Sequence, residues 1–228
     1  MSGSKRVKRG TTWPNRKKSQ DRADTEGKTV ETVNALSCQE FFRKYDPHEA
    51  RLKLWSSDPK LDSVGVDDAA SLSESRREIC LRLIEHTSAH DYENSDFGWS
   101  VSKKRKEMKL PDMKYITLFG ESTLAGFVSF MVTYEDGCEV LYIYEIHFFP
   151  QWQGKGLGKQ LMDLAEQIAR NIGLAKVMLT VFRANTRAVD WYTKLGYQED
   201  DFSPGPRKLR NGTVKEPSYI ILSKQLKR

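Results

Sequence analysis

A glycine-rich run at residues 153–159, Gln-Gly-Lys-Gly-Leu-Gly-Lys, has the composition of an anion-binding loop. Glycines leave room for successive backbone N–H groups to converge on one anion, and a following helix adds the positive end of its dipole. A ligand that carries a pyrophosphate suits such a loop. A tight surface turn entering a helix has the same composition, so the flanking residues must decide between the two.

The residues on either side predict a strand, loop, helix and strand in that order. Residues 139–149 are rich in β-branched and aromatic side chains and end at Pro150, which predicts a strand. Apolar residues recur at helical spacing over 157–172, and Gly173 is typical of a helix end. Residues 177–182 form a second short strand. Two parallel strands joined by a helix are therefore expected.

The glycine spacing disfavours two widespread kinds of phosphate loop. A Gly-x-x-x-x-Gly-Lys loop needs Ser or Thr next, whereas Gln160 follows Lys159 and brings no hydroxyl for a metal. A dinucleotide loop needs Gly-x-Gly-x-x-Gly, whereas Gly154, Gly156 and Gly158 are spaced two apart.

The loop resembles instead the acetyl-CoA loop of the GNAT acetyltransferase superfamily, because Gln153, Gly156 and Gly158 match its Arg/Gln-x-x-Gly-x-Gly/Ala pattern. A second motif of that superfamily, Asn-x-x-Ala-x-x-aromatic-Tyr-x-x-Leu-Gly-aromatic, is matched by Asn185, Ala188, Trp191, Tyr192, Leu195, Gly196 and Tyr197. The resemblance runs from about residue 75 onward. It implies an α/β fold with a central, mixed, mostly antiparallel twisted sheet flanked by helices, and acetyl-CoA as donor without a metal.

Within the superfamily, four segments are similar to the N-terminal acetyltransferases of the D type (NatD). They are residues 92–99, 139–145, 176–182 and 218–223. Phe97 stands where that family usually has Trp. The resemblance implies acetylation of the free α-amine of histone tails that begin Ser-Gly-Arg-Gly. A lysine or small-amine acetyltransferase and a non-catalytic CoA-binding module associated with ribosomes or chromatin remain as alternatives.

Attack of an amine on a thioester requires a group that removes a proton. A peptide α-amine, with a pKa of about 7.7 to 8.0, needs only a weak base. Glu145 is the candidate, since it ends an aromatic strand just before the loop. Tyr142 and Tyr144 either bind the peptide and pass a proton to the thiolate or pack in the core. His147 is left out of the catalytic set, because a single histidine on a mixed strand is more often a packing residue.

The resemblance also assigns binding residues. The peptide contacts are Tyr92, Phe97, Trp99, Tyr144, Thr180, Ser203 and Tyr219. The acetyl-CoA contacts are Ile146, His147 and Phe148 for the pantetheine, Gln153, Gly154, Lys155, Gly156, Leu157, Gly158 and Lys159 for the pyrophosphate, and Asn185 for the pantetheine arm. Acids near these segments are expected to include partners for the substrate arginine: Glu135, Asp136, Glu139, Glu199, Asp200, Asp201 and Glu216.

Positive charge is concentrated at the start of the chain. Residues 1–22 hold eight lysines and arginines against one acid, while the whole chain has a net charge of +6, so the remainder is nearly neutral. A disordered basic tail (1–30), a helical strap and loop (31–70) and an acetyltransferase domain (71–228) are expected. The tail would bind an import factor or ribosomal RNA. A monomer in cytoplasm and nucleus, with no membrane partner, is expected.

The remaining pattern predicts the surrounding elements. Residues 31–45 and 49–55 are expected to be helical, and residues 58–68 a loop. A capping box that starts at Ser71 predicts a helix to about His86, with Ile79, Leu83 and Ile84 buried. A hairpin over residues 115–134 is expected to turn at 120–122.

Overall fold

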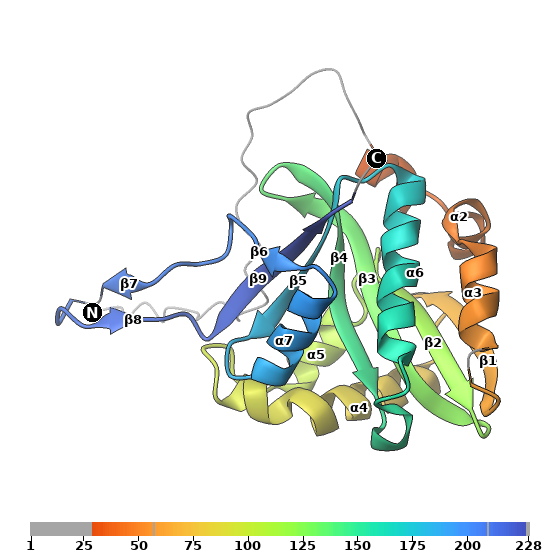
Figure 1. Ribbon diagram of the computed structural model, residues 1–228, viewed down its shortest axis with the longest axis horizontal. Helices are drawn as coiled ribbons and strands as arrows, with labels where there is room; N and C mark the ends of the chain where they lie inside the picture. Colours follow the sequence, from red (N-terminus) through yellow and green to blue (C-terminus); the bar gives the residue numbers. More distant parts are fainter. Residues whose placement is uncertain (1–28, 57, 209, 227–228) are drawn as a thin grey trace, which may run out of the picture.

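The computed structural model describes residues 29–56, 58–208 and 210–226. Residues 1–28 of the predicted tail lie outside them, whereas Thr29 and Val30, predicted to be disordered, begin the helix α1 (Thr29–Asn34). A seven-stranded sheet in the order β1-β2-β3-β4-β5-β9-β6 forms the centre (Figure 1). All neighbouring strands are antiparallel except β4 and β5, which are parallel. The predicted mixed, mostly antiparallel sheet is therefore confirmed. Its strands are β1 (Leu61–Asp68), β2 (Lys114–Gly120), β3 (Thr123–Glu135), β4 (Cys138–Phe148), β5 (Lys176–Phe182), β6 (Gln198–Glu199) and β9 (Tyr219–Gln225).

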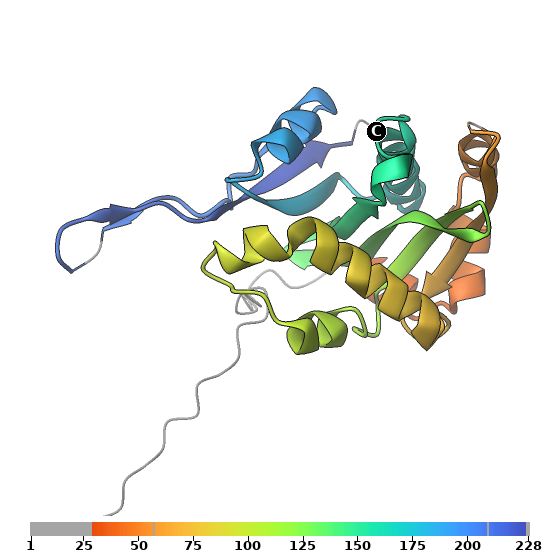
Figure 2. The same ribbon diagram turned by 90° about the horizontal axis from the view of Figure 1, so that it is seen from below.

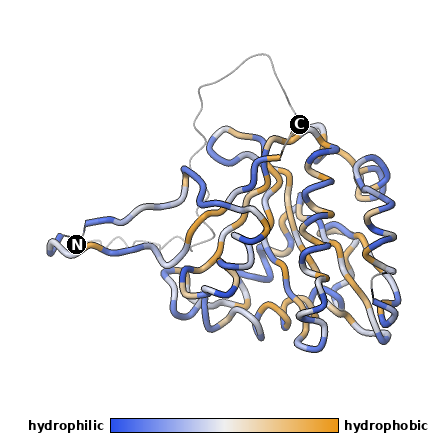
Figure 3. Tube along the Cα trace, viewed as in Figure 1, coloured by the Kyte–Doolittle hydropathy of each residue, from blue (hydrophilic) through white to orange (hydrophobic). Residues whose placement is uncertain are grey.

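Helices cover both faces of this sheet (Figure 2). One face carries α1 (Thr29–Asn34), α2 (Cys38–Tyr45), α3 (His48–Trp55) and α6 (Leu157–Ile172), whose apolar residues share one core with the strands. The other face carries α4 (Glu74–Glu93) and α5 (Val101–Glu107), which pack in a second core. The helix α7 (Thr186–Lys194) packs beside β5. Apolar residues gather along the strands between these layers (Figure 3).

The predicted helical strap belongs to the main core. Ser37 and Glu40 form a capping box that starts α2, so the first predicted helix is divided in two. The Phe41 ring is fully buried and lies edge-on to Phe42, with ring centroids 5.1 Å apart. Its centroid also lies 6.3 Å from that of Phe130 on β3, which joins the strap to the sheet.

Two sequence predictions in this region were wrong. Residues 58–68 do not form a loop, because Leu61–Asp68 pairs antiparallel with β2 as the edge strand β1. Its aspartates and glycine are typical of turns, but pairing with β2 and half-burial of Val64 and Val66 override those local preferences. The helix α4 begins after Ser73 rather than Ser71, and it continues to Glu93.

One buried residue of α4 was also predicted wrongly. Ile79 is 39% exposed, while Cys80, Leu81 and Ile84 are buried together with Leu83. The apolar stripe of the helix therefore lies one position away from Ile79. The hairpin β2–β3 and the parallel strands β4 and β5, with α6 between them and Gly173 as its left-handed cap, are confirmed.

A narrow ribbon extends from the body between β6 and β9 (Figures 1 and 2). It consists of β7 (Arg207–Lys208) and β8 (Val214–Lys215), whose residues are exposed. Lys215 Nζ lies 2.5 Å from Asp96 Oδ1, which ties the ribbon to the segment after α4. None of the described helices has the length and apolar character that a bilayer crossing requires.

Replacing Phe41 tests the role of the strap. We expect Phe41→Ala to lower the free energy of unfolding by about 3 to 5 kcal/mol, because it leaves a cavity between α2 and the sheet. Gln39→Ala, on the exposed side of the same helix, should change it by less than about 0.5 kcal/mol. Urea denaturation followed by fluorescence measures both. Equal stability of the two variants would show that the strap is not part of the core.

Candidate active site

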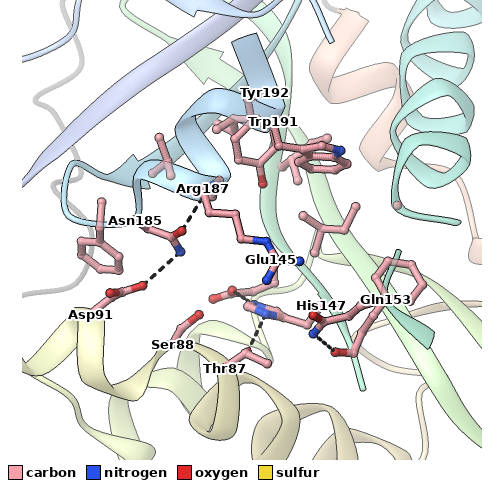
Figure 4. A pocket seen from close by; sticks show the side chains of 18 of the residues that line it. Thr87, Ser88, Asp91, Glu145, His147, Gln153, Asn185, Arg187, Trp191 and Tyr192 are labelled. Atoms are coloured by element: carbon pink, nitrogen blue, oxygen red, sulfur yellow. Dashed lines mark hydrogen bonds and ion pairs between the residues drawn. The ribbon is translucent and has the colours of Figure 1, made fainter. Parts of the chain in front are cut away.

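A cleft opens where the two parallel strands separate. β4 and β5 pair only from Val140 opposite Lys176 to Ile143 opposite Leu179. Beyond that point the two strands line opposite sides of a cleft of about 840 Å³. Helices α4 and α7 and the glycine loop complete its walls (Figure 4). Among the described strand pairs, β4 and β5 are the only central pair that separates, and the cleft lies at this separation.

A β-bulge changes the direction of side chains at the end of β4. Ser129 of β3 lies opposite Glu145, but the next residue, Phe130, lies opposite Ile143, so Tyr144 has no partner in the register. As a result, adjacent residues Tyr144 and Glu145 both line the cleft.

The glycine loop has the backbone geometry that an anion cradle requires. Gly154 and Gly156 have φ angles of +73° and +79°, which residues with a Cβ rarely adopt. Gly156 is the N-cap of α6, and no side chain of the described residues caps the helix there. The first N–H groups of α6 therefore face the cleft with the positive end of the helix dipole. A Cβ on Gly158 would lie 3.1 Å from the Trp191 ring, so close packing also favours glycine at this position.

The charged side chains of the loop have protein partners. Lys155 Nζ lies 2.9 Å from Asp58 Oδ2, and Lys159 Nζ lies 2.5 Å from Asp163 Oδ2. Lys155 is absent from the cleft lining, whereas Lys159 is part of it. Gln153 donates from Nε2 to the Phe148 carbonyl at 3.0 Å, which closes the loop onto the end of β4.

A buried lysine lies at the base of the cleft. Glu145 is 8% exposed and accepts hydrogen bonds at 2.7 Å from Lys104 Nζ and at 2.6 Å from His147 Nε2. Lys104, 4% exposed, also donates to Tyr92 Oη at 2.7 Å and to Glu107 Oε1 at 2.5 Å. Sequence reasoning missed Lys104, because it stands in the run Lys-Lys-Arg-Lys, which is typical of a solvated helix face.

These contacts fix the charges of the pair. Burial raises the pKa of Glu145, but Lys104 and the hydrogen bond from His147 outweigh it and lower the pKa to about 2. Burial lowers the pKa of Lys104, but Glu145 and Glu107 raise it well above its usual value. Glu145 is therefore a carboxylate and Lys104 an ammonium throughout the neutral range. Burial raises the pKa of Tyr144, so its phenol stays protonated.

An aromatic cluster begins at the cleft wall with Tyr92 and Phe182 and continues behind it through Trp99, Phe97 and Tyr219, which are not part of the lining. The Tyr92 ring lies 5.4 Å from Trp99 and 4.8 Å from Phe182, measured between centroids. The Phe97 ring lies 5.0 Å from Tyr219. The predicted peptide contacts Tyr92, Phe97, Trp99 and Tyr219 are thus brought together from α4, the following loop and β9.

The two predicted hydroxyl contacts lie in different places. Thr180 lines the cleft, and its hydroxyl forms a short hydrogen bond with the phenol of Tyr142. Ser203 is not part of the lining, and its Oγ accepts from the Ile221 N–H of β9 at 3.1 Å. The rings of Tyr142 and Tyr144 are 5.4 Å apart, so the bulge leaves both tyrosines close to Thr180.

The remaining predicted cofactor residues lie along the inner cleft. Ile146, His147, Phe148 and Asn185 all line it. The side-chain oxygen of Asn185 accepts from the Ala188 N–H at the start of α7, and its Nδ2 donates to Asp91 Oδ2, each at 3.1 Å. Asn185 therefore joins α7 to α4 across the cleft (Figure 4).

Three of the predicted acids have structural partners. Asp200 is buried against Lys176, with Oδ2 2.8 Å from Nζ, so it does not face a substrate. Glu139 Oε1 accepts from the Thr29 N–H at 2.8 Å, and Glu199 lies 3.4 Å from Arg183. Glu135 lies close enough to Tyr142 and Tyr144 to raise the pKa of both phenols, alongside the larger effect of burial. The described residues contain no group of three or more His, Cys, Asp or Glu that could hold a metal ion.

Comparison with known proteins identifies the family of this chain. The model of the acetyltransferase (GNAT) family matches residues 81–197, about half of the chain, including β4, the glycine loop and α7. This chain belongs to the GNAT acetyltransferase family. N-alpha-acetyltransferase 40 of Saccharomyces cerevisiae is 31% identical over 178 residues, which cover 63% of this chain and 62% of the yeast protein. The spermidine N(1)-acetyltransferase of Thermoplasma acidophilum is 26% identical, over 62% of this chain and 89% of that protein.

Solved structures of other GNAT enzymes share the fold. PaiA N-acetyltransferase of Thermoplasma acidophilum, determined in complex with coenzyme A, superposes with a TM-score of 0.51 at 20% identity. The match covers 72% of this chain and all of PaiA. Aminoglycoside 6'-acetyltransferase type Ii superposes with a TM-score of 0.53 at 17% identity, over 73% of this chain and 99% of that chain.

Removing the Lys104 charge should change the titration of Glu145. In Lys104→Met, burial is no longer opposed by the ammonium, so we expect the pKa of Glu145 to rise from about 2 by at least two units. Carboxyl ¹³C NMR measures this pKa, and Glu145→Gln assigns the resonance. Glu107→Gln is the matched control, because it removes another partner of Lys104 and leaves the contact with Glu145. An unchanged titration in Lys104→Met would contradict the charge assignment.

Proposed function

We propose that this chain is an N-terminal acetyltransferase of the NatD type, which transfers the acetyl group of acetyl-CoA to the α-amine of histone tails beginning Ser-Gly-Arg-Gly. One observation carries the proposal. One cleft is lined by the glycine loop, by the aromatic rings of Tyr92 and Phe182, and by Tyr144 and Glu145 at the bulge. A donor from one side and a peptide end from the other would meet there.

The inner half of the cleft fits acetyl-CoA. The uncapped start of α6 and the left-handed glycines suit a pyrophosphate. Beyond Ile143, β4 has no pairing with β5, so the edge at residues 146–148 is available for hydrogen bonds with the two amides of a pantetheine arm. Bound there, acetyl-CoA supplies an activated thioester. The shared fold with PaiA, which was determined with coenzyme A, supports this assignment.

The outer half fits the end of a peptide. Tyr92, Phe97, Trp99 and Tyr219 leave little room for a large first side chain. The hydroxyls of Tyr142 and Thr180 offer hydrogen bonds to a peptide backbone. The negative charge of Glu135 beside the two tyrosines complements an arginine at the third position. The 31% identity with yeast N-alpha-acetyltransferase 40 supports an N-terminal amine as acceptor.

Within this site the residues have separate tasks. Glu145 places a fixed negative charge beside the incoming ammonium and helps to orient it. Tyr144 stays protonated and lines the cleft next to Glu145, so it can give a proton to the departing thiolate. The aromatic wall holds the peptide end so that its amine points toward the bulge.

One second function has a specific observation behind it. The relative from Thermoplasma acidophilum acetylates spermidine, according to its name, so a lysine or small-amine acceptor is the competing proposal. A non-catalytic CoA-binding module associated with ribosomes or chromatin would bind the donor without releasing CoA. We also propose that histones are partners of this chain, and that residues 1–28 contact an import factor or the ribosome. The protein would act as a monomer in the cytoplasm and the nucleus.

A pair of peptides separates these functions. A peptide beginning Ser-Gly-Arg-Gly-Lys should release CoA from acetyl-CoA, and blocking its α-amine with an acetyl group should lower the rate at least about 100-fold, because the nucleophile is lost. The measurement is a thiol assay with mass spectrometry of the product. A lysine acetyltransferase would retain its rate on the blocked peptide, and spermidine turnover faster than that of the free peptide would favour the polyamine function.

Removing the Glu135 charge tests peptide selectivity. We expect Glu135→Gln to raise KM for the arginine peptide about tenfold, which corresponds to about 1.4 kcal/mol, because an ion pair is lost. The KM for the same peptide with Ala in place of Arg should barely change. Glu199→Gln, which removes a carboxylate paired with Arg183, serves as the control. Equal effects of Glu135→Gln on both peptides would exclude a contact with the arginine.

A further inference from the structure

The charge state of Glu145 raises a question about the reaction. A peptide α-ammonium has a pKa of about 7.7 to 8.0, almost six units above that of Glu145. Transfer of its proton to this carboxylate is therefore strongly unfavourable. Lys104 is the main cause, because it occupies one carboxylate oxygen permanently. Glu145 by itself is therefore a poor acceptor for the amine proton, and a neighbouring group in the cleft is better suited to take it.

The neighbouring His147 has an arrangement suited to that task. Its Nε2 lies 2.6 Å from Glu145 Oε2, and a carboxylate at this distance only accepts, so Nε2 carries a hydrogen and donates. The atom that gains or loses a proton is therefore Nδ1. Imidazole is the side chain that exchanges protons most readily around neutrality. The ring lines the cleft and is 11% exposed, so a proton held there can pass to solvent (Figure 4).

The hydroxyl of Thr87 allows Nδ1 to exist in both protonation states. Thr87 Oγ1 lies 2.7 Å from His147 Nδ1 and 2.8 Å from the Leu83 carbonyl oxygen. When Nδ1 is unprotonated, the hydroxyl donates to it. When Nδ1 carries a proton, Nδ1–H donates to Oγ1 and the hydroxyl turns toward Leu83. Both states keep their hydrogen bonds without any movement of heavy atoms, which is what a group that repeatedly takes up a proton requires.

The charges around the ring also balance. Glu145 contacts Nε2 of His147, and Lys104 contacts both Glu145 and Glu107. These two carboxylates and one ammonium leave one negative charge, which the positive charge of an imidazolium balances. From β3 the nearest ring is the uncharged Phe127, 5.9 Å away. Other titratable groups also line the cleft around His147. Those of α4 and β4 are Asp91, Tyr92 and Tyr144. Those of α6 and α7 are Lys159, Arg187, Asp190, Tyr192 and Lys194.

We propose that His147 is the general base of the reaction, held by Glu145 and Thr87. This inference rests on the proposed function. An N–H bond of the ammonium breaks and its proton binds to Thr87 Oγ1, while the hydroxyl hydrogen of Thr87 passes to Nδ1 of neutral His147. The amine keeps the electron pair with which it attacks the acetyl carbonyl carbon. Tyr144 gives its proton to the thiolate as the carbon–sulfur bond breaks, and the second proton that the nitrogen loses restores the Tyr144 phenol. His147 then returns its proton to solvent, so the products are the acetylated peptide, CoA and one proton.

Chemical rescue separates a base from a structural residue. We expect His147→Ala to lower kcat about 100-fold or more while the Kd for acetyl-CoA, measured by calorimetry, stays within about twofold. Added imidazole should restore the rate in a concentration-dependent way, and the rate should follow the basicity of substituted imidazoles. His90→Ala removes an exposed histidine of α4 and should leave the rate unchanged. A His147→Ala variant that keeps its rate, or that binds acetyl-CoA normally but is not rescued, would overturn the proposal.

The Thr87 hydroxyl provides a second, independent test. Thr87→Val should lower kcat about tenfold and alter the acidic limb of the pH profile of kcat/KM, whereas Thr87→Ser keeps the hydroxyl and should restore both. Identical profiles for Val and Ser would show that Thr87 does not position the base.

Assays with different acceptors show whether the role of His147 or the proposed N-terminal function is wrong. Wild-type protein is first assayed with free peptide, blocked peptide and spermidine. If only a lysine or a polyamine is acetylated, the N-terminal function fails, while the His147 variants are assayed with that acceptor. If no amine is acetylated, both proposals fall together. If the free peptide is acetylated and His147→Ala is as active as wild type, only the role of His147 is wrong.

Discussion

The separation of β4 from β5 is the constraint on which the rest of the site depends. Parallel pairing stops after four residue pairs, since the bulge at Tyr144 diverts β4 while β5 continues alongside β9. A sheet that stayed paired would leave no cleft, and an unfilled gap would leave buried backbone groups unsatisfied. The glycine loop lines one side of the gap and tyrosines line the other. The gap can therefore bind a ligand that supplies the missing hydrogen bonds.

Buried charge is the second organising feature. An isolated carboxylate or ammonium in this position would be costly, so Glu145 and Lys104 are stable there only because each is paired and further hydrogen bonded. The pairing keeps the α5 helix against α4 through Tyr92 and holds Glu145 ionised. A carboxylate with a fixed charge and direction is well suited to hold an imidazole, and His147 Nε2 lies 2.6 Å from Glu145 Oε2.

Much of the fold could be read from local pattern. The glycine loop, the amphipathic α6 and the strand before it follow from residue type and spacing within about forty residues, because their stability depends on near neighbours. The edge strand β1 could not be read in this way. Its Asp and Gly residues are typical of a turn, and only the backbone of β2, some fifty residues away, makes it a strand. Ile79 shows the same limit, since the phase of a helix on its sheet is set by packing.

The sequence by itself determined the donor side of the site, because a phosphate cradle needs glycines at fixed spacing and a helix directly after them. Only the tertiary structure decided what surrounds Glu145. Lys104, Thr87 and His147 come from three elements and carry no motif, and Lys104 stands in a run of basic residues that looks solvated. Side-chain pKa and hydrogen-bond direction depend on distances of a few ångströms between such groups, and spacing along the chain does not contain those distances.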